Sequence, residues 1–133
     1  MTQTLINPAS LFDGTAFSMS QAVLDHGSGL LFVSGQVDWD LDHQTSSDTI
    51  EGQLRSALEN LRTVLDEAGC TPRDLLHLRL YIRGEFGEHT EAAAGVLVEW
   101  LDGARPALTG IGVASLASPE TLVEIEAIAR KPD

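Results

Sequence analysis

Two carboxylates stand within an apolar strand near the end of the chain. In LVEIEAIA, residues 122–129, Glu124 and Glu126 alternate with aliphatic residues. Side chains of a strand point alternately to the two faces of a sheet, so both glutamates share one face. A carboxylate placed there can orient water or move a proton in a site, or it can meet a partner from another chain.

Few other residues are placed for chemistry. The four histidines, His26, His43, His77 and His89, form no pair at metal-ligand spacing. The acidic run DWDLDH, residues 38–43, lacks the glycine and the distal glutamate of a calcium loop and is interpreted as a solvated acidic loop. Ser34 has no histidine or lysine at motif spacing, which argues against a serine nucleophile. We therefore predict no metal and no cofactor.

Composition narrows the classes of partner. The 133 residues, 43% of them hydrophobic, predict one domain over 1–133 with a single core. A formal net charge of −12, with only 8 Lys and Arg, argues against nucleic acid and anionic membranes as partners. The single cysteine, Cys70, is interpreted as structural and favours a cytoplasmic location. No apolar stretch approaches the roughly 20 residues that span a bilayer, and the N-terminus lacks the pattern of a signal peptide.

Periodicity in the first half of the chain predicts a hairpin and a helix. Residues 15–39 form two runs around the turn DHGSG, which is typical of a β-hairpin. Residues 48–68 carry apolar side chains at three- and four-residue spacing and predict a helix. Asp48 and Glu51 are expected to form its capping box, and Gly69 to end it.

The second half predicts a strand over 74–84, a helix over 88–101 and two strands within 105–129. In the first of these strands the expected core side chains are Leu76, Leu78, Leu80 and Ile82. One more short strand is expected near the first hairpin. This order predicts an α+β fold, in which one mixed sheet carries two helices on a single face.

Such a fold leaves the other face of the sheet uncovered. On it we place residues from three strands: His77, Arg79, Tyr81 and Arg83; Leu108, Gly110, Gly112 and Ala114; and Glu124, Glu126 and Ile128. A face of this size with charges of both signs is typical of a subunit interface. We therefore expect the two glutamates to face a partner chain.

Four segments, in the same order, carry a resemblance to a known family. FVSGQVDWD, QLRSALENLRTVLDEAG, RPALT and LVEIEAIA together resemble the Rid proteins, the YjgF-type reactive intermediate deaminase superfamily, from about Asn7 to Ala129. The resemblance implies a chorismate-mutase-like fold and a homotrimer. In that trimer the sheets form a central barrel, and three clefts lie between neighbouring subunits.

The resemblance also implies an activity. The better-known branch of the family hydrolyses enamines and imines such as 2-aminoacrylate, which escape from pyridoxal-phosphate enzymes. An arginine of the penultimate strand holds the substrate carboxylate, within a Pro-Ala-Arg motif that is Pro106-Ala107-Leu108 here. Because leucine cannot replace a guanidinium that makes two charged hydrogen bonds, we expect a poor 2-aminoacrylate deaminase. Whether Arg79, Arg83 or Arg105 takes over is left open.

Two further departures accompany the missing arginine. The family's site cysteine corresponds to Gly110, and the asparagine contributed by the second helix falls within residues 92–94, which are all alanine. Three polar positions of the implied site are thus apolar or absent.

The remaining site positions match the resemblance. Ser34 and Gly35 correspond to backbone donors on the cleft floor, and Glu124 to the cleft glutamate, which makes it the candidate catalytic residue. The expected walls are Phe17, Met19, Trp39, Leu108, Thr109 and Gly110. A structural ion pair of Glu124 with Arg79 or Arg83 is an equal alternative, whereas Glu126 is interpreted as structural.

Two functions from different classes follow. The first is a deaminase-type hydrolase of C–N bonds, acting on an imine without a carboxylate, with Glu124 positioning the attacking water. The alternative is a homotrimer that binds or senses a small metabolite without catalysis. A pKa of Glu124 near neutrality would favour the enzyme, and one depressed by an arginine the structural role.

The exchange of arginine for leucine also predicts the class of ligand. With Leu108 on one wall and Glu124 as the only charge placed in the cleft, we expect neutral or cationic ligands with an apolar body. An anion would be repelled, because two like charges roughly 4 Å apart cost about 4 kcal/mol at an effective dielectric constant of about 20.

Overall fold

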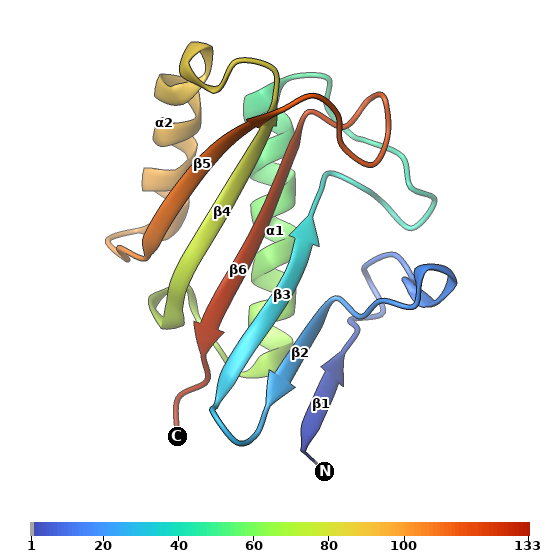
Figure 1. Ribbon diagram of the computed structural model, residues 1–133, viewed down its shortest axis with the longest axis vertical. Coiled ribbons are helices and arrows are strands. Elements are labelled where there is room, and N and C mark those ends of the chain that lie inside the picture. Colours follow the sequence, from blue (N-terminus) through green and yellow to red (C-terminus); the bar gives the residue numbers. More distant parts are fainter. Residues whose placement is uncertain (1) are drawn as a thin grey trace.

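The structure, a computed structural model, describes residues 2–133. One sheet has the strand order β1-β2-β3-β6-β4-β5 (Figure 1). Its strands are β1 (Gln3–Ile6), β2 (Ala22–Asp25), β3 (Leu30–Gln36), β4 (Leu75–Arg83), β5 (Ala107–Val113) and β6 (Val123–Arg130). Neighbours are antiparallel except β4 and β5, which are parallel and joined through a helix. The predicted mixed sheet is confirmed, and β1 is the additional short strand.

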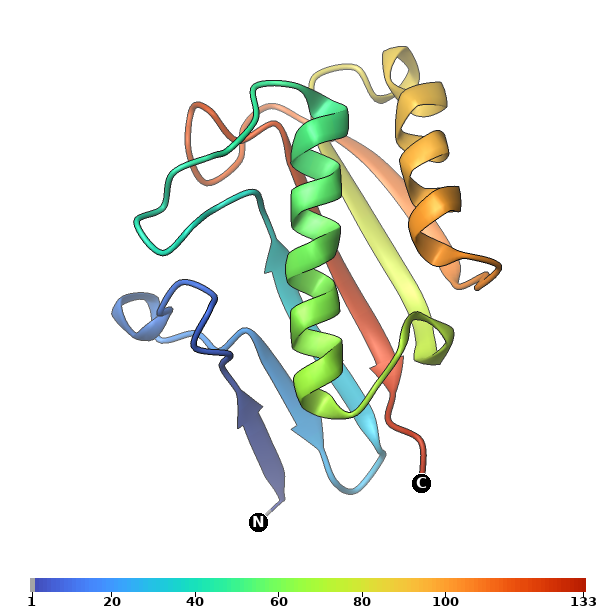
Figure 2. The ribbon, with the colours of Figure 1, turned by 180° about the vertical axis from the view of Figure 1, so that it is seen from behind.

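Both helices, α1 (Ile50–Ala68) and α2 (Thr90–Leu101), lie on one face of the sheet (Figure 2). The α+β class is therefore confirmed. Short 3-10 helices occur at η1 (Thr15–Phe17), η2 (Pro72–Asp74) and η3 (Phe86–Glu88). Among residues 2–133, no helix covers the opposite face of the sheet.

The apolar stripe of α1 forms the centre of the core. Its buried residues include Leu54, Leu58, Leu61 and Leu65, which pack over β3 and β6. Gly69 ends the helix in the left-handed region, at φ 78°, as predicted. The predicted capping box is wrong: Thr49, not Asp48, is the N-cap, and its hydroxyl accepts a hydrogen bond from the Gly52 N–H at 3.1 Å.

The first hairpin is shorter than its predicted span. Residues 15–17 form η1, and the strand begins only at Ala22. The Asp13 carboxylate accepts hydrogen bonds from both the backbone N–H and the hydroxyl of Thr15, and the Gly14 carbonyl accepts from the Phe17 and Met19 N–H groups. These local bonds turn the chain and bring the side chains of this loop beside β3.

A register shift corrects one predicted core position of β4. Leu78, Leu80 and Ile82 are buried, but Leu76 is 44% exposed. The pairing of β4 with β6 shifts between Leu75 and His77, so Leu75 points into the core instead. A bulge adds one residue to one strand and reverses the facing of the positions beyond it.

The predicted facing of β5 is wrong. Leu108, Gly110 and Gly112 pair with the buried β4 residues Leu78, Leu80 and Ile82, so they lie on the helix side of the sheet. The uncovered face instead receives Thr109, Ile111 and Val113, and Ala114 lies beyond the strand. A Cβ atom at Gly110 would lie 2.3 Å from the Phe86 ring. The glycine therefore makes room for η3, and an offset of one residue exchanges every side chain of a strand between faces.

Candidate functional site

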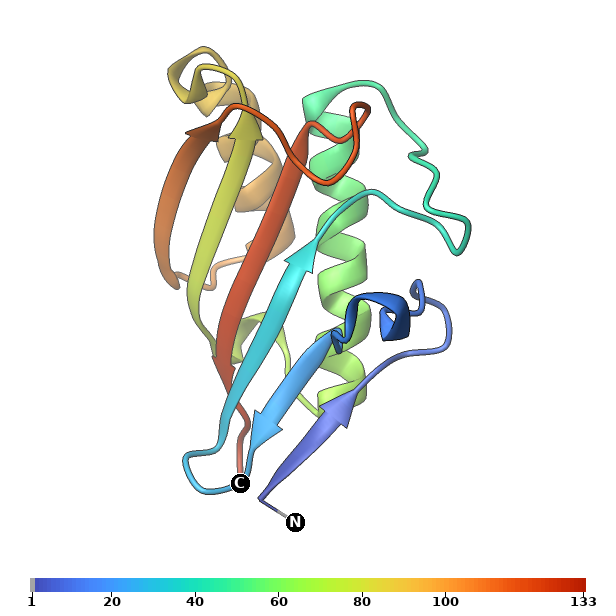
Figure 3. The same ribbon diagram turned by 45° about the vertical axis from the view of Figure 1, so that its right-hand side comes forward.

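A pocket of about 250 Å³ lies where β3 ends and β6 begins. The loop before β2, the loop after β3 and the loop between β5 and β6 all contribute lining residues, and Figure 3 shows these three loops at the same end of the sheet. Six of the predicted site residues line the pocket: Phe17, Met19, Ser34, Gly35, Trp39 and Glu124. Phe12, Val37 and Ala117 also line it and were missed by the sequence analysis.

Two buried glutamines hold the floor and one wall in place. Gln36 Nε2 donates to Gln21 Oε1 and to the Ser34 carbonyl, each at 3.0 Å. Gln21 Nε2 in turn donates to the Phe12 carbonyl at 2.9 Å. Since buried amide groups need partners, this relay fixes the Phe12 loop relative to β3.

Asp38 holds the opposite wall. It is buried, and its carboxylate accepts hydrogen bonds from the backbone N–H groups of Ser46 and Ser47 and from the hydroxyls of Ser46 and Ser56. The interpretation of residues 38–43 as a solvated acidic loop is therefore wrong at Asp38. Its carboxylate anchors the loop that presents Trp39 to the pocket.

The floor of the pocket is a bulge in β3. Val33 pairs with Ala127 and Gln36 with Ile125, so Ser34 and Gly35 share the single position opposite Glu126. The Ser34 N–H donates to the Gln21 carbonyl at 2.9 Å and its hydroxyl to the Ser20 carbonyl at 2.7 Å. Ser34 is thus committed to structure, which leaves Gly35 as the candidate backbone donor.

Gly35 also determines where Glu124 lies. A Cβ atom at position 35 would stand 2.5 Å from the Glu124 Cδ and Oε1 atoms. The glycine therefore lets the carboxylate lie directly against the backbone of β3. Any side chain at this position would displace it.

In the part of the chain that the structure describes, Glu124 is the one ionisable residue that lines the pocket. Its side chain is partly buried, and within residues 2–133 it has no salt bridge. Burial raises the pKa of this carboxyl, and the neighbouring charge of Glu126 raises it further. A carboxyl in such a place can exchange protons nearer to neutral pH than an ordinary glutamate.

The arginines considered as partners of Glu124 are engaged elsewhere. Arg79 Nη1 lies 3.6 Å from Glu126 Oε1, and Arg83 donates a hydrogen bond to the Pro119 carbonyl. Tyr81 donates its hydroxyl hydrogen bond to Glu126 as well, which is the main reason that the pKa of Tyr81 is raised. Within one chain, the ion-pair alternative applies to Glu126 and not to Glu124.

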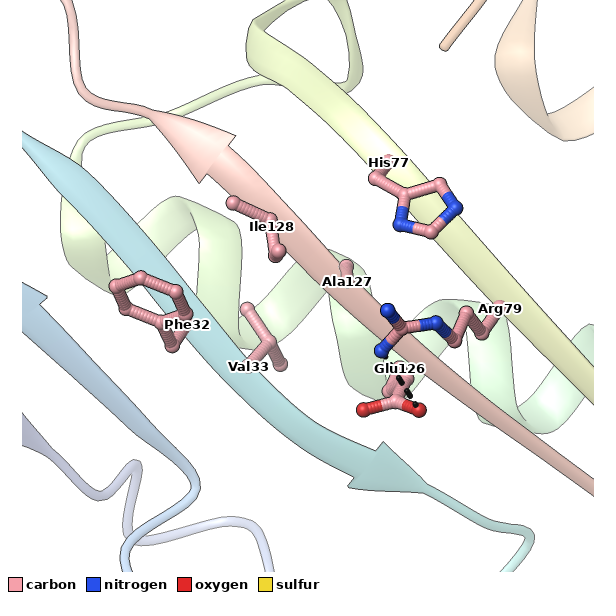
Figure 4. Close-up of a pocket in the computed structure, with 7 residues that line it drawn as sticks. All are labelled: Phe32, Val33, His77, Arg79, Glu126, Ala127 and Ile128. Atoms are coloured by element: carbon pink, nitrogen blue, oxygen red, sulfur yellow. Dashed lines mark ion pairs between the residues drawn. The ribbon is translucent and has the colours of Figure 1, made fainter. Parts of the chain in front are cut away.

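Glu126 belongs to the uncovered face of the sheet. A shallow cavity of about 240 Å³ on that face is lined by Phe32, Val33, His77, Arg79, Glu126, Ala127 and Ile128. Figure 4 shows Arg79 and Glu126 pointing toward each other from the adjacent strands β4 and β6, with the rings of His77 and Phe32 to either side.

The three predicted site residues of β5 do not join the pocket. Leu108 is 53% exposed and lines a separate cavity of about 450 Å³ between β5 and α2, together with Arg105 and Val98. Thr109 lies on the uncovered face, 3.3 Å from His77 Nε2, and Gly110 lies beneath Phe86. Of the three arginines that could replace the family's anchor, Arg105 is the one that shares a cavity with Leu108.

Other candidate chemistry has little support in the described residues. Among residues 2–133, no cluster of three or more His, Cys, Asp or Glu residues could hold a metal ion. Cys70 is buried, which raises the pKa of its thiol and keeps it unreactive. Neither helix in that part of the chain is long and apolar enough to cross a bilayer.

Known proteins are similar to this chain in sequence and in fold. The family model described as "Endoribonuclease L-PSP" matches residues 14–131. A RutC family protein of Pyrococcus horikoshii is 31% identical over 117 residues, which cover 84% of this chain and 86% of that protein.

Solved structures agree with the family model. A Rid family protein of Yersinia pestis is 34% identical with a TM-score of 0.73, covering 98% of this chain and 99% of its own. A YjgF/YER057c/UK114 family member of Mycobacterium tuberculosis is 29% identical with a TM-score of 0.81, covering 96% and 98%. The chain belongs to the L-PSP/YjgF/Rid family.

Proposed function

We propose that this member of the Rid family is a deaminase-type hydrolase that cleaves the C–N bond of an imine, with Glu124 as its acid–base residue. The observation that carries the proposal is the state of Glu124: partly buried, without a salt bridge among residues 2–133, and with a raised pKa in a largely apolar pocket. Burial is a common means of bringing a carboxyl toward the pH at which it can both accept and donate a proton.

The reaction needs one water and no cofactor. Glu124 accepts a proton from the water as its oxygen bonds to the imine carbon, which gives a carbinolamine. Glu124 then returns the proton to nitrogen, and the C–N bond breaks with its electron pair leaving on nitrogen. The hydroxyl proton passes through Glu124 to the departing ammonia as the carbonyl forms. A protonated imine and water thus give a carbonyl compound and an ammonium ion, with no change of oxidation state.

The proposed substrate lacks a carboxylate. The position that corresponds to the family's anchoring arginine is Leu108, and both Arg79 and Arg83 are engaged on the uncovered face. A carboxylate in the pocket would meet Glu124 with no cation among the lining residues. We therefore expect weak activity toward 2-aminoacrylate.

We also propose that the protein is a homotrimer, and that β5 of one subunit completes the pocket of the next. Phe17, 62% exposed, and Leu108, 53% exposed, line two different cavities of one chain. Contact between two different surfaces of identical chains is head-to-tail, and such contacts can close into rings. The trimer would bring Leu108, Thr109 and Gly110 of a neighbour toward Glu124. Light scattering after size exclusion should give three times the chain mass, and a monomer or dimer at micromolar concentration would contradict it.

A ribonuclease function is not proposed, although the family model carries that word. The formal net charge of −12 repels a phosphate backbone, whose binding depends on clustered basic residues. We expect a small-molecule substrate and a cytoplasmic location.

The activity can be tested with an imine that a second enzyme generates in the assay mixture. A flavin amine oxidase acting on 3-methylbutylamine releases the corresponding imine. Semicarbazide converts the imine and its aldehyde into the same semicarbazone, but the protonated imine reacts faster, so the initial rate of semicarbazone formation measures the free imine. The wild-type protein should convert imine to aldehyde and ammonium and so lower this initial rate, and Glu124→Gln should not. If wild type leaves the initial rate unchanged, the hydrolase proposal fails, and the non-catalytic binding trimer takes its place.

A further inference from the structure

The walls of the Glu124 pocket are aromatic. Phe12, Phe17 and Trp39 line it from two different loops. The Phe12 and Trp39 ring centroids lie 5.2 Å apart at an interplanar angle of 70°, so these rings form a corner and not a stack. The Met19 thioether lines the same pocket.

His43 lies beside the same three rings and is not among the residues that line the pocket. Its ring centroid lies 4.8 Å from that of Trp39, 5.3 Å from that of Phe12 and 6.5 Å from that of Phe17. His43 adopts the left-handed region at φ 61°, and its N–H donates to the Asp40 carbonyl at 3.1 Å. A non-glycine residue in this region needs support from its surroundings, so the loop is built to hold the imidazole there.

The pocket offers a negative charge, that of the Glu124 carboxylate, and no positive one among the lining residues. Among residues 2–133, Glu124 is the only ionisable residue that lines the pocket, and Glu126 stands two positions further along the same strand. Aromatic faces carry partial negative charge and attract organic cations, most strongly at Trp. A cation would therefore meet both a carboxylate and π surfaces. A neutral ligand would leave the carboxylate without a partner, and an anion would be repelled.

We infer that the pocket recognises an organic cation, an ammonium or iminium group on an apolar body, with the charge held between Glu124 and the corner formed by Phe12 and Trp39. The inference rests on the proposed function, because it names the substrate class of the same pocket. A protonated imine belongs to this class, and so does the amine that corresponds to it.

Binding can be measured without turnover, so this inference and the proposed function can fail separately. We would titrate the protein by calorimetry with three probes that share one branched body: 3-methylbutylammonium, 3-methylbutanol and 3-methylbutanoate. The ammonium should bind about tenfold more tightly than the alcohol, and the carboxylate should not bind measurably. Ammonium binding without imine hydrolysis would support the inference and reject the hydrolase.

Matched single substitutions test where the cation binds in the pocket. Glu124→Gln should reduce ammonium affinity about tenfold, to the level of the alcohol, whereas Glu126→Gln should change it less than about threefold. Trp39→Leu should weaken the ammonium more than the alcohol, and Trp39→Phe should keep most of the affinity. If Trp39→Leu does not fold, Phe12→Leu serves instead, because Phe12 forms the other side of the corner and lies outside the core.

Two results would overturn the inference. One is a carboxylate probe that binds more tightly than the ammonium; loss of that binding in Arg105→Gln would then identify Arg105, in the cavity between β5 and α2, as an anion anchor. The other is an ammonium affinity that Glu124→Gln leaves unchanged.

Discussion

Glu124 and Glu126 lie two residues apart on the same face of β6, yet their surroundings differ. Glu126 meets the Arg79 guanidinium and the Tyr81 hydroxyl on the uncovered face of the sheet. Glu124 lies over Gly35 at the bulge of β3, in an apolar pocket, and its pKa is raised. Both residues are glutamates of the same strand, so the difference lies in their partners. Glu126 is paired and structural, whereas Glu124 has no ion-pair partner among residues 2–133 and is available for chemistry.

The largest difference is expected in catalysis. Glu124→Gln should lower the rate of imine hydrolysis by about 100-fold or more, because a general acid–base group contributes about 10²–10⁴. Glu126→Gln removes the same charge from the same strand and should stay within about threefold of wild type. The semicarbazide competition assay measures both. Equal losses in the two variants would mean that the change of charge, and not the position, matters.

A methyl group added at position 35 should lower the activity by displacing Glu124, without unfolding the protein. In Gly35→Ala the new Cβ atom would stand 2.5 Å from the Glu124 Cδ atom, and a flexible glutamate can yield by moving away. We expect kcat/KM to fall about 10- to 100-fold, since a displacement of about 1 Å can cost that much. Gly95→Ala, at a helical glycine with open space around it, is the matched control and should keep full activity.

Leu108→Arg tests whether β5 of a neighbour reaches the pocket. If it does, affinity for 3-methylbutanoate should rise by about tenfold or more, because an arginine pairs with a carboxylate through two charged hydrogen bonds. Val98→Arg adds the same charge to the same cavity from α2 and serves as the control. An unchanged carboxylate affinity in Leu108→Arg, in a protein of confirmed trimeric mass, would place β5 away from the Glu124 pocket.

The two glutamates should also affect stability in opposite directions. Because the pKa of Glu124 is raised, the folded protein keeps this proton at a pH where the unfolded chain has lost it. The stability from this group is present below the ordinary glutamate range and is lost as pH rises through the raised pKa. Tyr81 and Glu126, the titratable groups beside it, add no positive charge.

Glu124→Gln should therefore raise the melting temperature at about pH 8 and leave it nearly unchanged at about pH 4, below the unfolded pKa. Glu126→Gln should lower it at about pH 8, by the equivalent of about 1 kcal/mol, since a half-exposed ion pair and one hydrogen bond are weakened. Thermal melts at both pH values give the comparison. A loss of stability in Glu124→Gln at the higher pH would show that Glu124 has a partner.

The helices and β4 could be predicted because their side chains repeat with a clear period. The stripe of α1 and the alternation of Leu78, Leu80 and Ile82 record which side faces the core. The cap and the bulge could not be predicted, because Thr49 stands beside the expected Asp48 and nothing in LLHLRL marks Leu76 as the residue that turns outward. The cap is a local hydrogen bond for which two adjacent residues carry suitable acceptors, and the bulge depends on pairing with the distant strand β6.

The prediction of which β5 side chains lie on the uncovered face is wrong for a different reason. The segment ALTGIGV alternates apolar residues with glycine and carries almost no polar signal. Its glycines are required because the Phe86 ring packs over Gly110 and the Gly84 carbonyl approaches Gly112, which no pattern within the strand records. The same holds for Phe12 and Ala117 in the pocket. Phe12 is placed by the relay through Gln21 and Gln36, and such loop positions have no periodicity.

The state of Glu124 is the centre of the account, and a carboxyl titration measures it directly. In protein labelled with ¹³C at the glutamate side-chain carboxyl, the signal that disappears in Glu124→Gln is assigned to this residue. We predict a titration midpoint above the ordinary glutamate value of about 4.3. A midpoint at or below that value would contradict the account, because it would mean that a cation of the assembled protein pairs with Glu124 and that both carboxylates of the strand are interface partners.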